Sequence, residues 1–249
     1  MHIPYIMVAP NGARHGRADH PAIPVSIAET VAVAHACQGA GARGLHLHVR
    51  DADGRHSLDA GHYSEALSEL ARAVPDLEVQ ITTEAAGRFD VAAQMRCVQQ
   101  VQPKWASVSV REIARAPDMA DRMYGLCDEQ GTRVQHILYD AADAALLKRW
   151  QEAGIIRAGQ VDRLLVLGRY TTGQVSTPAD IDGFDPGPSP WMVCAFGPQE
   201  HACLQSAARQ GADLRVGFEN SLTRSDGRRW IDNAASVAAL VSLLERTVA

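Results

Sequence analysis

Eight short apolar runs, separated by segments with helical spacing, most constrain how this 249-residue chain can fold. The runs have the length of strands and are bounded by Gly, Pro or Asp. They lie at residues 5–10, 44–50, 77–83, 105–110, 133–139, 163–168, 191–196 and 213–219. Apolar residues recur every three or four positions between them, which predicts helices at 25–41, 61–74, 89–101, 116–131, 141–154, 199–211 and 233–248. This alternation predicts parallel strands joined by helices.

Eight such units predict a (β/α)8 TIM barrel, a fold that typically needs about 250 residues. We therefore expect one barrel domain over residues 1–249. The sixth helix falls in a stretch rich in Pro, Gly and Asp, 170–190, so it should be short, with Thr177 as N-cap and Pro178 at the first helical position. A doubly wound open sheet has the same alternation. No Gly-rich dinucleotide motif follows the first strand, which argues against a Rossmann cofactor site.

Composition narrows the classes of function. Hydrophobic residues make up 46% and charged residues 21% of the chain, and no stretch approaches the roughly 20 apolar residues that span a bilayer. The N-terminus lacks the pattern of a secretory signal, so we expect a cytoplasmic protein. A net charge of -5 argues against nucleic acid as a partner. The cysteines lack CxxC spacing and are expected to be buried thiols: Cys37, Cys97, Cys127, Cys194 and Cys203.

Two histidines, His46 and His48, end the second predicted strand. Residues two apart on a strand point to the same side, and the carboxyl ends of barrel strands form the active-site face. One divalent metal would satisfy both imidazole acceptors, at about 2.0–2.1 Å for zinc. Two hydrogen-bonded core histidines are the alternative. If the pair binds metal, we expect Asp51 or a backbone carbonyl to accept the other imidazole N–H.

A carboxylate, Glu219, ends the eighth predicted strand. In a closed barrel this strand lies next to the first strand and near the second, which carries the histidines. Two histidines and one carboxylate leave a coordination position open, as catalytic zinc sites do. The sequence therefore predicts a metal site formed by His46, His48 and Glu219.

Several separated segments resemble the β-keto acid cleavage enzymes, whose best-known type is the 3-keto-5-aminohexanoate cleavage enzyme. In chain order they are NGARHGRADHPAIPVS (11–26), GARGLHLHVRDADGRHSLD (41–59), VLGRYTTGQVSTPADI (166–181), WMVCAFGPQE (191–200) and GADLRVGFENSL (211–222). The resemblance implies a TIM barrel with Zn²⁺ or a similar divalent metal at His46, His48 and Glu219, usually as a homo-oligomer such as a dimer or tetramer. It also implies that a small-molecule β-keto acid and acetyl-CoA, as cosubstrate, give acetoacetate and a new acyl-CoA thioester.

The resemblance assigns roles to three further residues. Arg215 matches the catalytic arginine of the family and would hold a carboxylate or an oxyanion. The alternative for Arg215 is an ion pair at the bottom of the barrel. Thr82 and Ser109 fall near positions whose hydroxyls contact substrate in the family, although both could equally be ordinary hydroxyls at strand ends.

The chain departs from the family pattern in several places. After the fourth predicted strand the expected glycine-containing turn is missing, which places Arg111 and Glu112 near the rim of the barrel. Asn220 stands where the family has the aspartate expected to act as general base. Glu84, in the third loop, could replace that base, unless it is a solvated residue or an ion-pair partner of Arg88. Arg14 stands in the first loop where the aminohexanoate enzyme has an acidic residue, so we expect a substrate with an anionic or polar tail.

Two other classes of function fit the same residues. One is a metal-dependent carbon–carbon lyase or hydrolase that uses no CoA. Amidohydrolases also carry paired histidines, and His136 is a candidate inward residue for such a site, but the eighth strand offers Glu rather than Asp. The other class is a non-catalytic barrel that has kept its metal, as Asn220 suggests.

Overall fold

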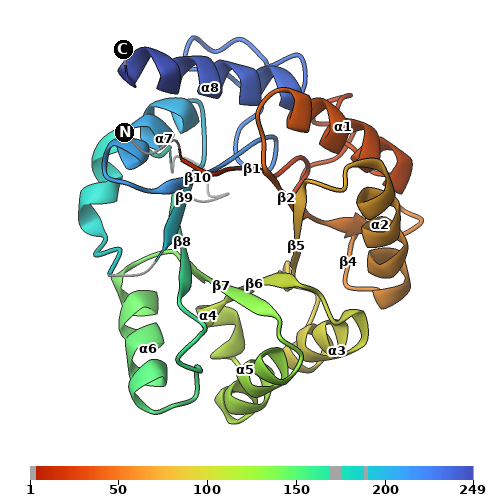
Figure 1. Cartoon of the computed structure of the whole chain (residues 1–249), viewed down its shortest axis with the longest axis vertical. Helices are drawn as coiled ribbons and strands as arrows, with labels where there is room; N and C mark the ends of the chain where they lie inside the picture. Colours follow the sequence, from red (N-terminus) through yellow and green to blue (C-terminus); the bar gives the residue numbers. More distant parts are fainter. Residues whose placement is uncertain (1–3, 169–174, 188–189, 249) are drawn as a thin grey trace.

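A closed barrel of parallel strands forms the centre of the protein (Figure 1). The computed structural model describes residues 4–168, 175–187 and 190–248. The strands are β1 (Ile6–Val8), β2 (Gly44–Leu47), β5 (Glu78–Thr82), β6 (Trp105–Ser109), β7 (Arg133–Leu138), β8 (Asp162–Leu167), β9 (Trp191–Ala195) and β10 (Asp213–Val216). Their order around the barrel is β1-β10-β9-β8-β7-β6-β5-β2. The predicted (β/α)8 TIM barrel is confirmed.

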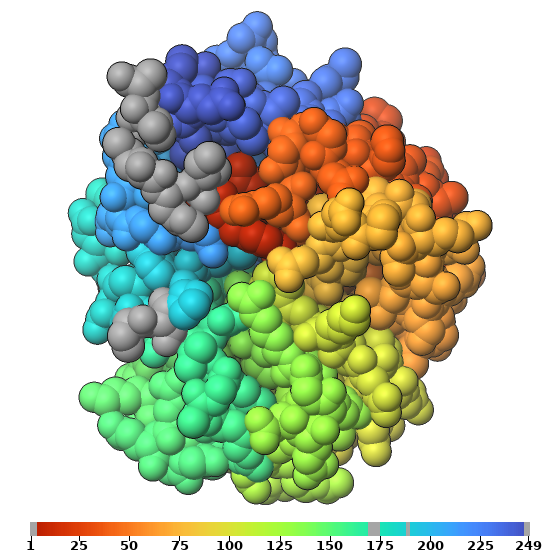
Figure 2. Space-filling view, in the orientation of Figure 1, coloured from red at the N-terminus to blue at the C-terminus, as the bar shows by residue number. Residues whose placement is uncertain are grey.

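Helices surround this barrel in chain order. They are α1 (Ile27–Gly39), α2 (Ala60–Ala73), α3 (Val91–Val101), α4 (Val110–Ile113), α5 (Ala120–Glu129), α6 (Ala141–Glu152), α7 (Glu200–Arg209) and α8 (Asn233–Val248), with 3-10 helices η1 (Pro117–Met119) and η2 (Pro178–Gly183). In the space-filling view, segments that follow one another in the sequence also lie next to one another around the molecule, and the blue carboxyl-terminal region meets the orange region of α1 (Figure 2). The two ends of the chain thus complete the ring.

Local hydrogen bonds explain where several helices begin. Ser26 and Glu29 form a reciprocal capping box at the start of α1, and the Asp59 side chain accepts a hydrogen bond from the backbone N–H of His62 at the start of α2. The short sixth helix is confirmed as η2, with Thr177 as its cap and Pro178 in the first turn. Other parts of the predicted 170–190 segment, residues 170–174 and 188–189, lie outside the described residues.

Most predicted strands are shorter in the structure, and the shortening of two of them affects the predicted metal ligands. The second strand ends at Leu47, so His48 lies between β2 and a two-residue strand, β3 (Val49–Arg50), which pairs with β4 (His56–Ser57). The eighth strand ends at Val216, so Glu219 lies in the turn that follows rather than on the strand. The predicted helix over 116–131 also differs, because it divides into η1 and α5.

The inside of the barrel is partly polar, unlike the apolar layer between strands and helices. Gln80 Nε2 donates to Gln135 Oε1 across the interior at 3.1 Å. His136, next to Gln135, points the other way: its Nε2 contacts the Gln160 carbonyl at 3.0 Å and its ring lies 5.4 Å from that of Tyr124. The expectation that His136 faces inward is therefore wrong, because strand side chains alternate and its two neighbours occupy the inward positions.

The predicted cysteine chemistry agrees with the structure. All five cysteines are buried free thiols. No helix in the described part of the chain has both the length and the hydropathy needed to cross a bilayer.

Candidate active site

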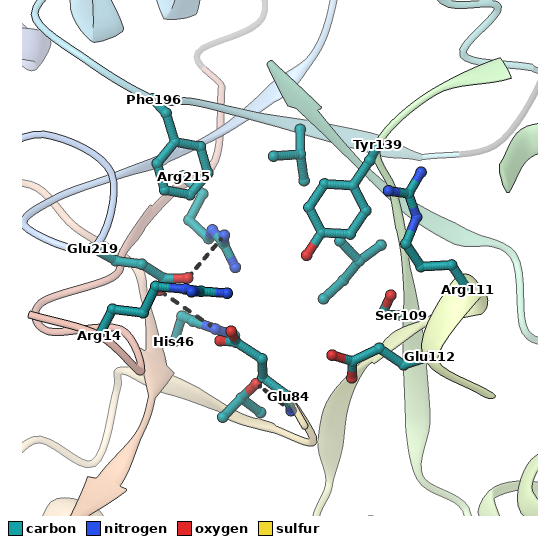
Figure 3. Close-up of a pocket in the computed structure, with 13 residues that line it drawn as sticks. Arg14, His46, Glu84, Ser109, Arg111, Glu112, Tyr139, Phe196, Arg215 and Glu219 are labelled. Carbon is teal, nitrogen blue, oxygen red and sulfur yellow. Dashed lines mark hydrogen bonds and ion pairs between the residues drawn. The ribbon is translucent and has the colours of Figure 1, made fainter. Parts of the chain in front are cut away.

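A cavity of about 230 Å³ opens at the carboxyl ends of the barrel strands (Figure 3). It contains seven of the residues singled out from the sequence: Arg14, His46, Thr82, Glu84, Ser109, Arg215 and Glu219. The described residues that complete its lining are Arg111, Glu112, Ile137, Tyr139, Val166 and Phe196. His48 and Asn220 are buried beside the cavity but do not line it. Residues from all eight barrel strands or the loops that follow them thus meet at the position expected for a TIM-barrel active site.

Three potential metal ligands converge at one side of this cavity. The Nε2 atoms of His46 and His48 lie 3.2 Å apart, and Glu219 Oε2 lies 3.6 Å from each of them. All three side chains are buried, and their ligand atoms lie within 4.8 Å of one another. The geometry therefore offers two imidazole nitrogens and one carboxylate oxygen to a single ion.

Hydrogen bonds determine which nitrogen of His46 can bind a metal. Its Nδ1 lies 2.7 Å from Gln80 Oε1, and Gln80 is oriented by its own donation to Gln135. Since an amide oxygen only accepts, His46 Nδ1 carries the hydrogen and Nε2 is left as an acceptor. Burial, together with the charge of Arg215, holds the pKa of His46 well below its usual range, so the ring is neutral.

His48 is oriented in the same way by a second histidine. Its Nδ1 lies 3.4 Å from Nδ1 of His56, whose Nε2 lies 2.8 Å from the Glu84 carbonyl oxygen. Burial lowers the pKa of His56 to about 3, so His56 is neutral, donates from Nε2 and accepts at Nδ1. His48 must then donate from Nδ1, which leaves its Nε2 as an acceptor.

These tautomers place two buried nitrogen lone pairs face to face beside a carboxylate. Such an arrangement is unfavourable without a cation between the acceptors, and it fits a divalent metal. The expectation that Asp51 orients one of the histidines is wrong. Asp51 is on the surface, where its carboxylate accepts from the backbone N–H groups of Asp53 and Arg55.

The turn that carries Glu219 is held by three elements. Gly217 has φ +139°, and a Cβ there would lie 2.5 Å from the Ala9 carbonyl oxygen, so only glycine fits. The Gly217 N–H donates to Glu200 at 3.0 Å, and the Glu219 N–H donates to Ala9 O at 3.0 Å. The Asn233 side chain accepts from the next N–H, that of Phe218, at 2.9 Å. Glu219 is thus fixed by backbone contacts, although it lies beyond the strand.

Arg215 connects the metal ligands to the cavity. One Nη2 hydrogen bond reaches Glu219 Oε1 at 3.3 Å, and another reaches Cys194 Sγ at 3.3 Å. Burial alone would raise the pKa of Glu219, but the charge of Arg215 beside it holds this pKa well below the usual range. Since Arg215 lines the cavity at the carboxyl ends of the strands, an ion pair at the barrel bottom is excluded.

The first loop is held so that Arg14 reaches the cavity. Arg50 donates to the backbone carbonyls of Asn11 at 3.3 Å, Ala13 at 3.3 Å and His15 at 3.0 Å, and also to that of Gly12. Arg50 was not predicted to have this role, although it follows the two histidines in the same motif. Only the fold brings its guanidinium to carbonyls that lie 35 to 39 positions away in sequence.

Glu84 extends into the cavity from the loop after β5 (Figure 3). Burial raises the pKa of its carboxyl, in part against the opposing effect of His48 and Arg14. Arg88, the ion-pair partner considered from the sequence, instead contacts the His56 carbonyl at 2.5 Å and Asp51 at 3.6 Å. Glu84 is therefore a half-buried carboxyl that faces the cavity with a raised affinity for protons.

Two predicted hydroxyls line the cavity and differ in their contacts. Thr82 Oγ1 accepts from the Glu84 N–H at 3.0 Å and so supports the loop. Ser109 Oγ is buried and has no hydrogen-bond partner among the described residues. Ser109 is thus available to a ligand.

Asn220 contacts the site from behind. Its Nδ2 donates to the Arg215 carbonyl at 3.2 Å, and its amide interacts with the carboxyl of Glu200. Burial raises the pKa of Glu200 well above its usual range. Asn220 therefore supports the backbone that carries Arg215 and Glu219.

Two aromatic residues that line the cavity were not predicted from the sequence. Tyr139 and Phe196 follow β7 and β9, and the rule that active-site residues follow barrel strands could have found them. Arg111 also lines the cavity, as its predicted place near the rim implies. Its charge is balanced because Nε donates to Asp143 and Nη2 to Asp140, and Nη2 also forms an ion pair with Asp143. These acidic partners precede or begin α6, and nothing in the local sequence of Arg111 indicates them.

Together, the fold and the site define a class: a TIM barrel with a buried two-histidine, one-carboxylate site open to a polar cavity. Residues 4–248 match the family model described as beta-keto acid cleavage enzyme, so the chain belongs to the β-keto acid cleavage enzyme family. The resemblance inferred from the motifs is confirmed, and the protein is an enzyme of this type.

Characterised relatives are distant but nearly full-length. The 3-keto-5-aminohexanoate cleavage enzyme of Fusobacterium nucleatum is 23% identical over 245 residues, with 95% of this chain and 87% of the relative covered. The 3-oxoadipate:acetyl-CoA acetyltransferase of Cupriavidus necator is 22% identical over 257 residues, with coverage of 96% and 88%. At this distance the relatives differ from one another in substrate.

Solved structures agree on the fold. ObcA in complex with oxaloacetate superposes with a TM-score of 0.72 at 18% identity, covering 92% of this chain and 65% of ObcA. A type I 3-dehydroquinate dehydratase from Clostridium difficile gives a TM-score of 0.64 at 10% identity, covering 98% and 93%. These similarities support the TIM barrel.

Proposed function

We propose that this enzyme uses a divalent metal, such as Zn²⁺, to convert a β-keto acid and acetyl-CoA into acetoacetate and a new acyl-CoA thioester. A bond forms between C2 of the keto acid and the acetyl carbon, the C2–C3 bond breaks, and CoA passes to the released acyl group. The observation that carries the proposal is the pair of facing imidazole acceptors beside Glu219 at the edge of the cavity. Acetyl-CoA is proposed because the relatives include acetyl-CoA-dependent transferases.

The metal would be held by Nε2 of His46, Nε2 of His48 and a carboxylate oxygen of Glu219. When bound, it would act as a Lewis acid towards the keto and carboxylate oxygens of the substrate and make the C2 proton more acidic. Arg215 holds Glu219 ionised and presents a fixed positive charge to a substrate carboxylate or a developing oxyanion.

We propose Glu84 as the base that removes the C2 proton. It is a carboxyl with a raised pKa that extends into the cavity, whereas Asn220 lacks a proton-accepting carboxylate and lies outside the cavity lining. Asn220 would instead orient Arg215 through its carbonyl. Ser109, Thr82 and Arg14 would contact the substrate, with Arg14 facing its tail.

Acetyl-labelled acetyl-CoA provides the test. Purified protein, with and without added Zn²⁺, is incubated with labelled acetyl-CoA and each of a panel of β-keto acids that includes 3-oxoadipate and 3-keto-5-aminohexanoate. We expect the label in acetoacetate and not in the new thioester, as mass spectrometry can measure. Exchange of the C2 proton without any thioester would favour a lyase or hydrolase that needs no CoA. Metal binding without exchange or cleavage on any substrate would favour a barrel that has lost its reaction.

Three further properties belong to this proposal. We propose that residues 1–249 act as one barrel domain, that the enzyme works in the cytoplasm, and that it assembles as a homo-oligomer such as a dimer or tetramer. Light scattering during gel filtration would measure the assembly state.

A further inference from the structure

His56 lies between the metal ligands and the proposed base, and it contacts both His48 and the loop of Glu84. It is 1% exposed and stands in β4, eight residues after His48. Its backbone is fixed twice, because Arg50 pairs with it in the β3–β4 ladder and Arg88 donates to its carbonyl. Its ring also packs edge-on against Phe89 with a centroid distance of 5.8 Å. The imidazole is therefore held in one orientation.

Both ring nitrogens of His56 are used, and each contact has a direction. Nε2 donates to the Glu84 carbonyl at 2.8 Å, so Nδ1 is the acceptor that faces Nδ1 of His48 at 3.4 Å. His48 consequently keeps its hydrogen on Nδ1 and directs the Nε2 lone pair toward His46 and Glu219. A side chain with only a donor or only an acceptor could not satisfy both neighbours.

The second contact of His56 reaches the turn that carries Glu84. On its other side this turn is held by Thr83, whose Oγ1 donates to Ser107 O at 2.8 Å, and by Glu112, which accepts from the Ala85 N–H at 2.9 Å. His56 supplies the corresponding support on the metal side. Without it, the Glu84 carbonyl would lose its ring donor.

We propose that His56 is a positioning residue that sets His48 as an Nε2 metal ligand and couples this ligand to the turn of the base Glu84. The part that concerns Glu84 rests on the proposed function, whereas the part that concerns metal affinity does not. Groups that orient a ligating histidine commonly change metal affinity by about 10–100-fold when removed. His56 would therefore act both on metal binding and on proton removal without touching either the metal or the substrate.

Two substitutions separate hydrogen bonding from packing. His56→Phe keeps an aromatic ring against Phe89 but removes both hydrogen bonds. His56→Gln offers an amide oxygen toward His48 and an amide N–H toward Glu84, so it can restore both. His136→Phe is the matched control, because His136 is fully buried, makes one contact to a backbone carbonyl and packs beside Tyr124 in the outer layer.

Zn²⁺ affinity is measured by competition with a chromophoric chelator, in the absence of any substrate. We expect His56→Phe to weaken it by about 10–100-fold, His56→Gln to recover part of the loss, and His136→Phe to leave it unchanged. At saturating Zn²⁺, exchange of the substrate C2 proton should also be slower in His56→Phe than in His136→Phe. Wild-type Zn²⁺ affinity in a folded His56→Phe protein would overturn the proposal.

A measurement on the wild type covers the case in which His56→Phe does not fold. Nitrogen-15 NMR of the metal-free protein should show His48 protonated on Nδ1 and unprotonated on Nε2, and His56 with the opposite tautomer. The reverse assignment would overturn the proposal without any variant. If the tautomers and Zn²⁺ affinities are as expected but no β-keto acid exchanges its C2 proton, the proposed function fails while the role of His56 in metal binding stands.

Discussion

The two ends of the barrel both gather charged and aromatic residues, but they arrange them differently. At the amino ends of the strands, Arg133 forms an ion pair with Asp162 and lies 4.3 Å from the ring centroid of Trp105, while the Tyr5 N–H donates to Asp213 at 2.8 Å. The charged groups are paired around a cavity of only about 70 Å³, although the Trp105 indole N–H has no hydrogen-bond partner among the described residues. At the carboxyl ends, acceptors and hydroxyls face a larger cavity instead.

This difference separates stability from function. A charge that is paired within the protein lowers the free energy of the folded state, whereas lone pairs that converge on a space cost free energy until a ligand enters. The facing imidazoles and the buried Ser109 hydroxyl are of the second kind. We therefore expect substitutions at the carboxyl ends to affect binding and reaction, and those at the amino ends to affect unfolding.

The largest expected effect is loss of the metal. Wild-type protein should carry about one equivalent of divalent metal per chain, and His48→Ala should lose most of it because two ligands leave an open, weak site. Elemental analysis after dialysis measures this directly. Full metal retention in His48→Ala would contradict the assignment of the ligands.

Removal of the proposed base should leave the metal in place. Glu84→Gln should slow C2 proton exchange by about 10²–10⁴-fold with unchanged metal content, as measured by deuterium incorporation. Because the pKa of Glu84 is raised, the wild-type exchange rate should fall on the acid side at a higher pH than an ordinary glutamate would give, and this fall should be absent in Glu84→Gln. Undiminished exchange would exclude Glu84 as the base.

A second substitution tests whether a carboxylate at position 220, where the family has an aspartate, can act as the base in place of Glu84. Asn220→Asp, made in the Glu84→Gln background, should restore part of the exchange if a carboxylate beside Arg215 can reach C2. An unchanged rate would indicate that Asn220 is too far behind the cavity lining. An inactive wild type that gains exchange on Asn220→Asp would mark an enzyme that has lost its base.

Arg14 should affect one class of substrate more than another. Arg14→Glu should weaken binding of a β-keto acid with an anionic tail by about 2–5 kcal/mol if the contact is buried, and should favour one with an amine tail. The ratio of kcat/KM values for 3-oxoadipate and 3-keto-5-aminohexanoate measures the change. Equal effects on both substrates would show that Arg14 does not contact the tail.

The smallest effect is expected at the other end of the barrel. Asp162→Asn removes the ion pair with Arg133, whose side chain is 48% exposed, so solvent limits the loss to about 1 kcal/mol of unfolding free energy. Urea denaturation measures the loss, and metal content and proton exchange should not change. A change in metal content or proton exchange would contradict the expectation that residues at the amino ends affect only stability.

The sequence by itself determined the strands, the helices and most of the residues that meet in the cavity. Their signals are local: apolar periods of two and 3.6 residues, the capping residues Ser26 and Thr177, and the HxH spacing of His46 and His48. Because barrel strands run parallel, residues near their carboxyl ends must converge, which is why Thr82, Ser109 and Arg215 could be placed together.

Only the tertiary structure decided which groups orient these residues. Gln80 and His56 fix the two ligand tautomers, Arg50 holds the loop of Arg14, and Glu200 holds the turn of Glu219. Each of these contacts depends on a direction in space and, apart from that of His56, joins segments 17 or more positions apart. The inward placement of His136 failed for the same reason, since a one-residue difference in strand phase turns a side chain from the cavity to the helices.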